Sequence, residues 1–288
     1  MEVNDLAGLK EPLAKLVESV GNAVGAVYEP TRIRRKAKAD AEAMLTLAGA
    51  EIKVEELKRR ADKRVTHTEL RRQRNIAQIV AKAVTELPER VEEQPADEDW
   101  IAQFFNLSQD VGDADMQILW GRILAGEVAR PGAYSLRTLQ TVKVLSKRDA
   151  QLFSQYCSYV WRIPGGALCR YTTRATDKLL AERGMGAAER QHLQNIGLLY
   201  GSGLMSDSGS QTTVRSGDGP FEVVYFGRKY VVSHFLSPKE SALLIPEFLT
   251  DIGAELFPIS GARPDEQYLQ SLIEALKDED KLEVTGVD

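Results

Sequence analysis

The sequence has few of the residues from which binding and catalytic sites are most often built. Of its 288 residues only two are cysteine and three are histidine. Secreted disulfide scaffolds carry more cysteines, so Cys157 and Cys169 favour a reducing compartment. No run of about eighteen apolar residues is present, so we expect no conventional membrane span. The first residues lack a basic segment and a cleavage motif, so we expect no signal peptide and a cytoplasmic location.

The histidines and acids do not form a recognisable catalytic or metal-binding pattern. His67, His192 and His234 lie in different segments, and HExxH, CxxC, GxSxG and phosphate-loop motifs are absent. Asp113 and Asp115 could do acid–base chemistry, but they stand where a helix N-terminus favours a cap and negative charge. We therefore expect no catalytic residue, no metal and no cofactor, and the sequence favours a protein that is not an enzyme.

The charge of the whole chain argues against nucleic-acid binding, but one region is basic. The net charge is −5, whereas residues 31–82 hold fifteen Lys and Arg against seven Asp and Glu. A basic helix can bind a phosphate backbone. The alternative is a solvated face with ion pairs four residues apart, such as Glu55–Arg59 and Glu56–Arg60. The candidate contacts with nucleic acid or another anion are Arg32, Arg34, Arg35, Lys38, Arg59, Arg60, Arg64, Arg71, Arg72 and Arg74.

The N-terminal part, residues 1–87, has helical patterning throughout. Apolar residues recur every three or four positions in residues 6–28, which predicts an amphipathic helix that packs on its own protein or docks on a membrane surface or partner helix. Residues 31–87 predict one long helix, or a hairpin broken near Gly49 or at 65–68. The apolar stripe of this region is narrow and rich in alanine. Such a stripe suits pairing with another helix, including one from a second copy.

The next two segments differ in composition. Residues 88–99 are acidic, begin at a proline and predict a linker. Residues 100–163 predict a central helical module whose aromatic residues form a core. Within it Asp113 and Ser146 are placed to cap helices, and Pro131 with the following glycine marks a turn.

Residues 164–288 predict a smaller α+β domain that begins at a Pro-Gly-Gly stretch. Two short helices precede a β-hairpin at 221–232, which is the order of a winged-helix unit. The second helix offers only Arg190 and His192 as basic residues, so a winged-helix-like interaction module is favoured over a DNA reader. The expected fold is mainly α, with long N-terminal helices, a central helical bundle and this C-terminal module.

Several separated phrases of the sequence resemble one bacterial family, the domain of unknown function 2806. The phrases occur in order, and the match covers most of the chain. They are YEP at 28–30, DADMQILWGRILAGE at 113–127, RPGAYSLRTL at 130–139, LSKRDAQLF at 145–153 and FLTDIGAELF at 248–257. The resemblance supplies no catalytic residues, and we interpret Glu127 and Arg137 as an ion pair or as caps.

A looser similarity connects these helices to the abortive-infection alpha family of phage-resistance proteins. It implies a role in defence against phage. The leading interpretation is therefore a non-enzymatic interaction or effector protein that self-associates or binds a protein partner. The alternatives are a nucleic-acid-associated regulator, and a membrane-perturbing effector acting through residues 6–28.

Overall fold

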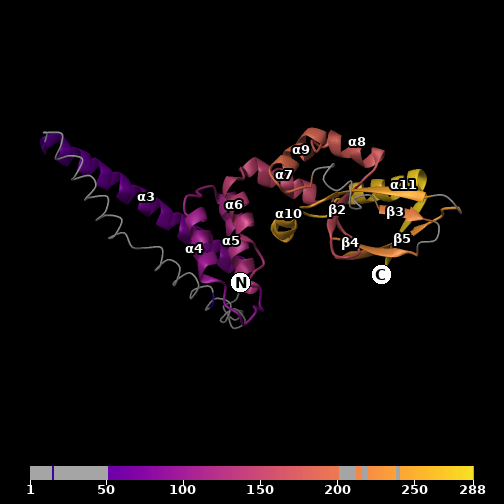
Figure 1. Cartoon of the computed structure of the whole chain (residues 1–288), viewed down its shortest axis with the longest axis horizontal. Coiled ribbons are helices and arrows are strands. Elements are labelled where there is room, and N and C mark those ends of the chain that lie inside the picture. The colour runs from indigo at the N-terminus through magenta and orange to yellow at the C-terminus, as the bar shows by residue number, and fades with distance from the viewer. Residues whose placement is uncertain (1–14, 16–50, 201–211, 216–218, 238–240, 288) are drawn as a thin grey trace, which may run out of the picture. The chain divides into compact units, whose positions relative to one another are not determined.

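The computed structural model describes residue 15 and residues 51–200, 212–215, 219–237 and 241–287 (Figure 1). The chain divides into two compact units, residues 1–143 and 144–288. The division that we expected from the sequence lies further along, at 163/164. The expected amphipathic helix at 6–28 falls outside the described residues except for Lys15.

Helix α3 (Glu51–Glu86) dominates the described part of the first unit and is 36 residues long. It contains neither proline nor glycine, and it runs through residues 65–68 without interruption. A hairpin broken at 65–68 is therefore wrong, because nothing in that stretch removes a backbone hydrogen bond. The alternative break near Gly49 lies outside the described residues.

Three shorter helices follow α3. They are α4 (Glu98–Ser108), α5 (Ala114–Ala129) and α6 (Leu136–Val144). Two of them, α4 and α5, pack against the C-terminal half of α3. The cap predicted at Asp113 is confirmed, since its side chain accepts hydrogen bonds from the backbone N–H groups of Asp115 and Met116 at 2.9 and 3.0 Å. The turn predicted after α5 is also confirmed, because the helix ends just before Pro131.

Helices α3 and α5 approach closely because a glycine lies at their contact. A Cβ atom added at Gly121 would come within 2.8 Å of the Lys82 Cβ atom and 3.0 Å of the Ala83 backbone nitrogen. The core of the unit is aromatic: Trp100 and Phe104 stack at 5.4 Å, and Trp120 meets Phe104 edge-on at 5.2 Å.

The turn between α5 and α6 is held by a buried carboxylate. Glu127 is 1% exposed and accepts hydrogen bonds from the backbone N–H groups of Gly132 and Tyr134 at 2.6 and 3.0 Å. Of the two roles that we expected for Glu127 and Arg137, an ion pair or caps, Glu127 takes the second, since it accepts from backbone N–H groups.

The second unit contains an antiparallel sheet with the strand order β3-β6-β2-β1-β4-β5-β7. Some strands pair with the next strand in the sequence, and others pair with a strand that is distant in the sequence. The strands are β1 (Trp161–Arg162), β2 (Leu168–Thr172), β3 (Thr212–Arg215), β4 (Phe221–Tyr225), β5 (Arg228–His234), β6 (Ser241–Phe248) and β7 (Leu282–Val287).

Two β-turns of this sheet use left-handed backbone conformations. Gly165 and Gly166, in the stretch expected to open a new domain, have φ of +84° and +85° and form the turn between β1 and β2. The hairpin predicted at 221–232 is confirmed, with Phe226 and Gly227 at positive φ in its turn.

Five described helices belong to this unit. They are α7 (Lys147–Cys157), α8 (Arg174–Glu182), α9 (Ala187–Asn195), α10 (Asp251–Leu256) and α11 (Glu266–Asp280), with a short 3-10 helix after α10. Among them α11 contacts β7 and α8. The cap predicted at Ser146 is confirmed as a reciprocal pair with Asp149. The architecture is therefore mixed α+β, with the described strands confined to the second unit.

Candidate interaction surface on helix α3

The two halves of α3 have different surroundings. In the C-terminal half, Asn75, Ile76, Ile79 and Ala83 are each at most 8% exposed, because this face packs against α5 and α4. In the N-terminal half, almost every described side chain is exposed or half-buried. In Figure 1 this half extends beyond α4, α5 and α6.

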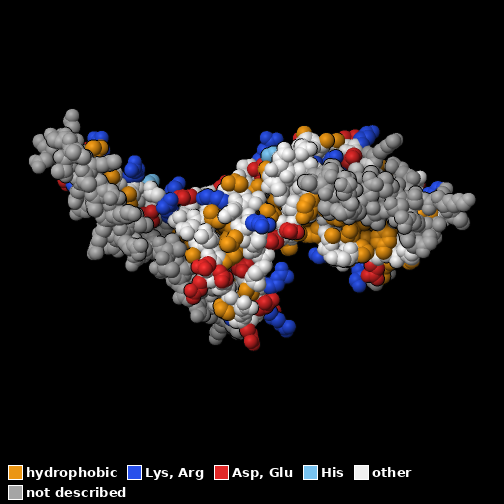
Figure 2. Space-filling view, in the orientation of Figure 1, with side chains coloured by type: hydrophobic (Ala, Val, Ile, Leu, Met, Phe, Trp, Pro, Cys, Tyr) orange, Lys and Arg blue, Asp and Glu red, His pale blue; other side chains and the backbone are white. Residues whose placement is uncertain are grey.

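The buried face of α3 continues into the exposed half as an apolar stripe. Steps of three or four residues place Val54, Leu57, Ala61 and Val65 on the same side as Ile79. We call these four residues the α3 stripe. Leu57 is 57% exposed and Val65 is 47% exposed. Figure 2 shows hydrophobic side chains beside basic ones along this part of the helix.

Charged side chains of both signs lie on each flank of the α3 stripe. At 3.6 residues per turn, one flank carries Glu56, Arg60, Arg64 and Arg71, and the other carries Lys58, Asp62 and Glu69. An apolar stripe with charged flanks is the pattern of a helix that pairs with another helix.

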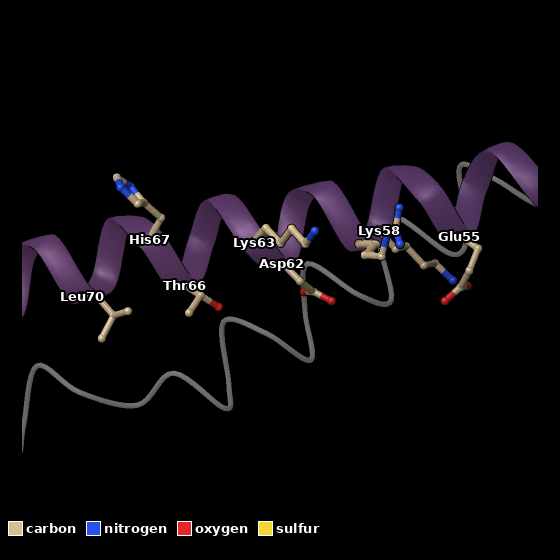
Figure 3. Close-up of a pocket in the computed structure, with 8 residues that line it drawn as sticks. Glu55, Lys58, Asp62, Lys63, Thr66, His67 and Leu70 are labelled. Carbon is tan, nitrogen blue, oxygen red and sulfur yellow. The ribbon is translucent and has the colours of Figure 1, made fainter.

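A hollow of about 730 Å³ borders α3 along the flank that carries Asp62 and the face beyond it. Its described lining comes from this helix alone: Glu55, Lys58, Arg59, Asp62, Lys63, Thr66, His67 and Leu70. In Figure 3, Glu55, Asp62, Thr66 and Leu70 point to one side, whereas His67 points away. The lining is mixed in charge and provides no convergent set of groups for a ligand.

Four of the predicted anion-binding residues are engaged in ion pairs. Arg59 and Arg60 both contact Glu56, at 2.5 and 2.8 Å, and all three side chains are solvent-exposed. The Glu56–Arg60 pair matches the solvated-face alternative. Arg71 and Arg72 both contact Asp110, which follows α4, at 2.8 and 3.0 Å.

The Asp110 pair affects the ionisation of both partners. The hydrogen bond from Arg72 lowers the pKa of Asp110 in spite of its partial burial, and the same hydrogen bond raises the pKa of Arg72. These two arginines therefore fasten α3 to the end of α4.

The six other predicted anion contacts fall into two groups, two that lie within the described residues and four that lie outside them. Within the described part of the chain, Arg64 and Arg74 have neither a hydrogen-bond nor an ion-pair partner. The remaining predicted contacts lie outside the described residues: Arg32, Arg34, Arg35 and Lys38.

A buried charge network in the second unit was not predicted from the sequence. Arg170 on β2 is fully buried, and its Nη2 atom donates to Glu247 on β6 at 2.8 Å and to Asp177 on α8 at 3.1 Å. Arg190 on α9 donates to Glu247 at 3.1 Å. Burial alone would lower the pKa of Arg170, but the attraction to Glu247 raises it overall.

The network joins two strands and two helices, and its two arginines balance its two carboxylates. The Tyr156 hydroxyl lies 3.4 Å from Glu247, and burial raises the pKa of this phenol. The Nη1 atom of Arg170 is buried and has no hydrogen-bond partner among the described residues. The arrangement fixes α8 and α9 to the sheet. A signal was present in the sequence, since Arg170 and Glu247 each interrupt an apolar, strand-like stretch.

The histidines do not converge. His192 lies 2.7 Å from Asp149, so it joins α9 to the N-terminus of α7. His67 projects from α3, and His234 ends β5. Among the residues that the structure describes, no three His, Cys, Asp or Glu side chains cluster as metal ligands would, and no helix is both long and apolar enough to cross a membrane.

Comparison with known proteins gives one positive result. The model of the family described as "Protein of unknown function (DUF2806)" matches residues 59–273, well over half of the chain. No curated protein and no solved structure matches. The looser resemblance to the abortive-infection alpha family therefore gains no support. The match includes most of α3, all the helices from α4 to α10 and much of α11, and the chain belongs to the DUF2806 family.

Proposed function

We propose that this protein is a non-enzymatic interaction protein that binds a protein partner through the exposed half of α3. The observation that carries the proposal is the α3 stripe. Leu57 and Val65 remain about half exposed on a helix whose other half buries the same face. Burying a large aliphatic side chain contributes roughly 1.5–3 kcal/mol. A complex in which a partner helix covered Leu57 and Val65 would therefore be stabilised at these positions.

The roles of the acidic side chains in the fold support the non-enzymatic part of this proposal. Asp113 and Asp149 cap helices, Glu127 accepts from a turn, and Glu247 neutralises buried arginines. Each of these carboxylates has a role in the fold that accounts for its position.

A photo-crosslinking amino acid placed at Leu57 or Val65 of the full chain in cells tests the proposal. Gln73, an exposed position on another face of α3, is the matched control. We expect adducts heavier than the chain from positions 57 and 65 and none from 73. The absence of adducts at both stripe positions would overturn the proposal.

We also propose that part of the second unit is a winged-helix-like interaction module. Support comes from the chain order β2, α8, α9, β3 and β6, combined with the sheet order β3-β6-β2. The wing would then be the connection between β3 and β6, which contains the β4–β5 hairpin. The hairpin itself pairs with β1 and β7.

The surface of α9 favours protein contact over DNA reading in that module. Arg190 and His192 are engaged with Glu247 and Asp149. The exposed positions that remain are uncharged: Ala187, Ala188, Gln191 and Asn195. Introducing Glu at Ala188 should therefore leave DNA binding unchanged and weaken only a protein complex.

Nucleic-acid regulation is the second candidate function. Arg64 and Arg74 favour it, because they are exposed and unpartnered among the described residues. If it is correct, a random DNA duplex binds with a steep salt dependence, and each Arg→Glu change reduces the salt slope by about 1. The absence of binding at low salt would exclude it.

A role in defence against phage rests on the looser sequence resemblance alone. It predicts that expression of the chain lowers phage plating and that Leu57→Glu with Val65→Glu abolishes this effect. Unchanged plating across a broad phage panel would remove that role. The membrane alternative concerns residues 6–28, which lie outside the described residues except Lys15.

A further inference from the structure

The basic residues of α3 gather on one side of the helix, although in the sequence they form separate blocks at 58–64 and 71–74. The two blocks share one axis, because α3 runs through residues 65–68 without interruption. At 3.6 residues per turn, six basic side chains from residues 60–74 project within about 100° of the helix circumference. We call these six residues the α3 basic face: Arg60, Lys63, Arg64, His67, Arg71 and Arg74.

The acidic residues of the same stretch lie on another side of α3. Asp62 and Glu69 project roughly half a turn away from the centre of the α3 basic face. Glu56 lies at the N-terminal end of the face, where it pairs with Arg60. Between residues 57 and 78 of this helix, no acidic side chain projects from the α3 basic face.

Four members of the α3 basic face can contact a ligand without losing an ion pair. Arg60 and Arg71 are already in ion pairs within the chain. The other members are exposed and have neither a hydrogen-bond nor an ion-pair partner among the residues that the structure describes: Lys63, Arg64, His67 and Arg74. The lysine and the two arginines of this set span about 16 Å of the helix axis at 1.5 Å per residue.

Three cations in a row fit a line of phosphates. One strand of B-form DNA carries a phosphate about every 3.4 Å, so a duplex that lies along the face presents about five phosphates over this length. Because α3 contains no aromatic residue, it offers no platform on which unpaired bases could stack, which favours a duplex over a single strand. An anionic membrane is disfavoured, because a helix at a membrane surface buries its apolar side, and one flank of the α3 stripe carries Asp62 and Glu69.

We propose that the α3 basic face binds the phosphate backbone of a nucleic-acid duplex, with Lys63, Arg64 and Arg74 as the contacts. This inference rests on the second candidate function, nucleic-acid regulation, and gives it a site and a ligand. Binding is independent of base sequence, because contacts to phosphates position a duplex without reading its bases. Arg59 lies outside the face and pairs with Glu56.

Fluorescence anisotropy of the full chain with a labelled random duplex, of DNA or of RNA, tests the site. At about 100 mM salt charges act over about 10 Å, so a charge reversal has a local effect. Arg64→Glu and Arg74→Glu should each raise the dissociation constant at least fivefold. Arg59→Glu is the matched control, because Arg59 is exposed on another side of the same helix, and the change in the dissociation constant should stay below twofold.

The salt dependence of binding is a second readout, which a loss of folded protein would not change. Each phosphate contact contributes about 0.9 to the slope of the logarithm of the binding constant against the logarithm of the salt concentration. Arg64→Gln with Arg74→Gln should therefore reduce this slope by about 2, and Arg59→Gln should leave it unchanged. An unchanged slope in the double variant would overturn the proposal.

The outcomes separate this inference from the function on which it rests. Duplex binding that Arg59→Glu weakens as strongly as Arg64→Glu would retain the nucleic-acid function and reject the site. Tighter binding to a single strand, or to vesicles of about one-third phosphatidylserine, would reject the duplex as the ligand. No duplex binding at low salt would reject the site and the nucleic-acid function together, whereas photo-crosslinking at positions 57 and 65 tests the protein partner by itself.

Discussion

Arg170 and Glu247 stand opposite each other at paired positions of β2 and β6, and the arginine donates from Nε and Nη2 to a single carboxylate oxygen at 3.0 and 2.8 Å. The same carboxylate receives Arg190 from α9. Glu247 therefore contacts two largely buried guanidinium groups, with Asp177 as the second negative charge, and it joins a helix to strands β2 and β6.

We expect Glu247→Ala to be severely destabilising, because it leaves two arginines without their main counter-ion in the interior. Removing one partner of a buried ion pair costs about 3–5 kcal/mol. Hydrogen exchange of the β2 and β6 amides measures this, and exchange should accelerate by roughly 150- to 5,000-fold. Glu222→Ala, at an exposed position on β4, is the control and should change exchange little. Unchanged protection of β2 in the Glu247 variant would contradict this role.

The contact between α3 and α5 should be sensitive to a single added methyl group. Gly121→Ala places a Cβ atom 2.8 Å from the Lys82 Cβ atom, so the helices must separate, at a cost of about 1–3 kcal/mol. A thermal melt should show a lower Tm. Gly112→Ala is a matched control, since nothing lies within 4 Å of its added Cβ atom. Equal melting of the two variants would show that α3 and α5 do not pack as described.

The sequence predicts well what neighbouring residues determine. The caps at Asp113 and Ser146 were predicted because a helix cap depends on residues two or three positions away. The hairpin at 221–232 was predicted because its turn residues lie between its strands. Pairing over long separations leaves no comparable local signal, so β3, β6 and β7 were missed. Strands β1 and β2 were missed although they form a local hairpin, because β1 is only two residues long. Arg170 and Glu247 are 77 residues apart.

The candidate surface on α3 was also only partly predictable from the sequence. The spacing of Leu57, Ala61 and Val65 predicts a narrow apolar stripe from the sequence alone. Where that stripe leaves the bundle could not be predicted, because this depends on the crossing of α3 by α5 at Gly121. Likewise, the arginine-rich stretch was visible, but its pairing with Asp110 depends on where α4 ends.

The two cysteines should be inert in the folded chain. Burial raises the pKa of the Cys169 thiol to about 12 and raises that of Cys157 further, so neither is a thiolate at neutral pH. We expect no reaction with a disulfide reagent such as DTNB in native buffer and two thiols per chain in denaturant. Rapid native labelling of either cysteine would contradict the burial of α7 and β2.

Asp149 should contribute an acid-dependent part of the stability of the second unit. Its burial opposes ionisation, but hydrogen bonds from His192 and Ser146 outweigh this and lower its pKa. A carboxyl whose pKa is lower in the folded than in the unfolded chain stabilises the fold above the unfolded value, about 3.9, and this contribution is lost as pH falls through the folded value. Asp149→Asn should therefore lower the Tm at pH 7, and the difference in Tm from the natural chain should narrow below about pH 4.

Thermal melts by circular dichroism at pH 7, 4, 3 and 2.5 measure this Tm difference, with Glu222→Gln as the exposed control. A Tm difference that is the same at pH 7 and pH 2.5 would show that the carboxylate charge is not what joins α7 to α9.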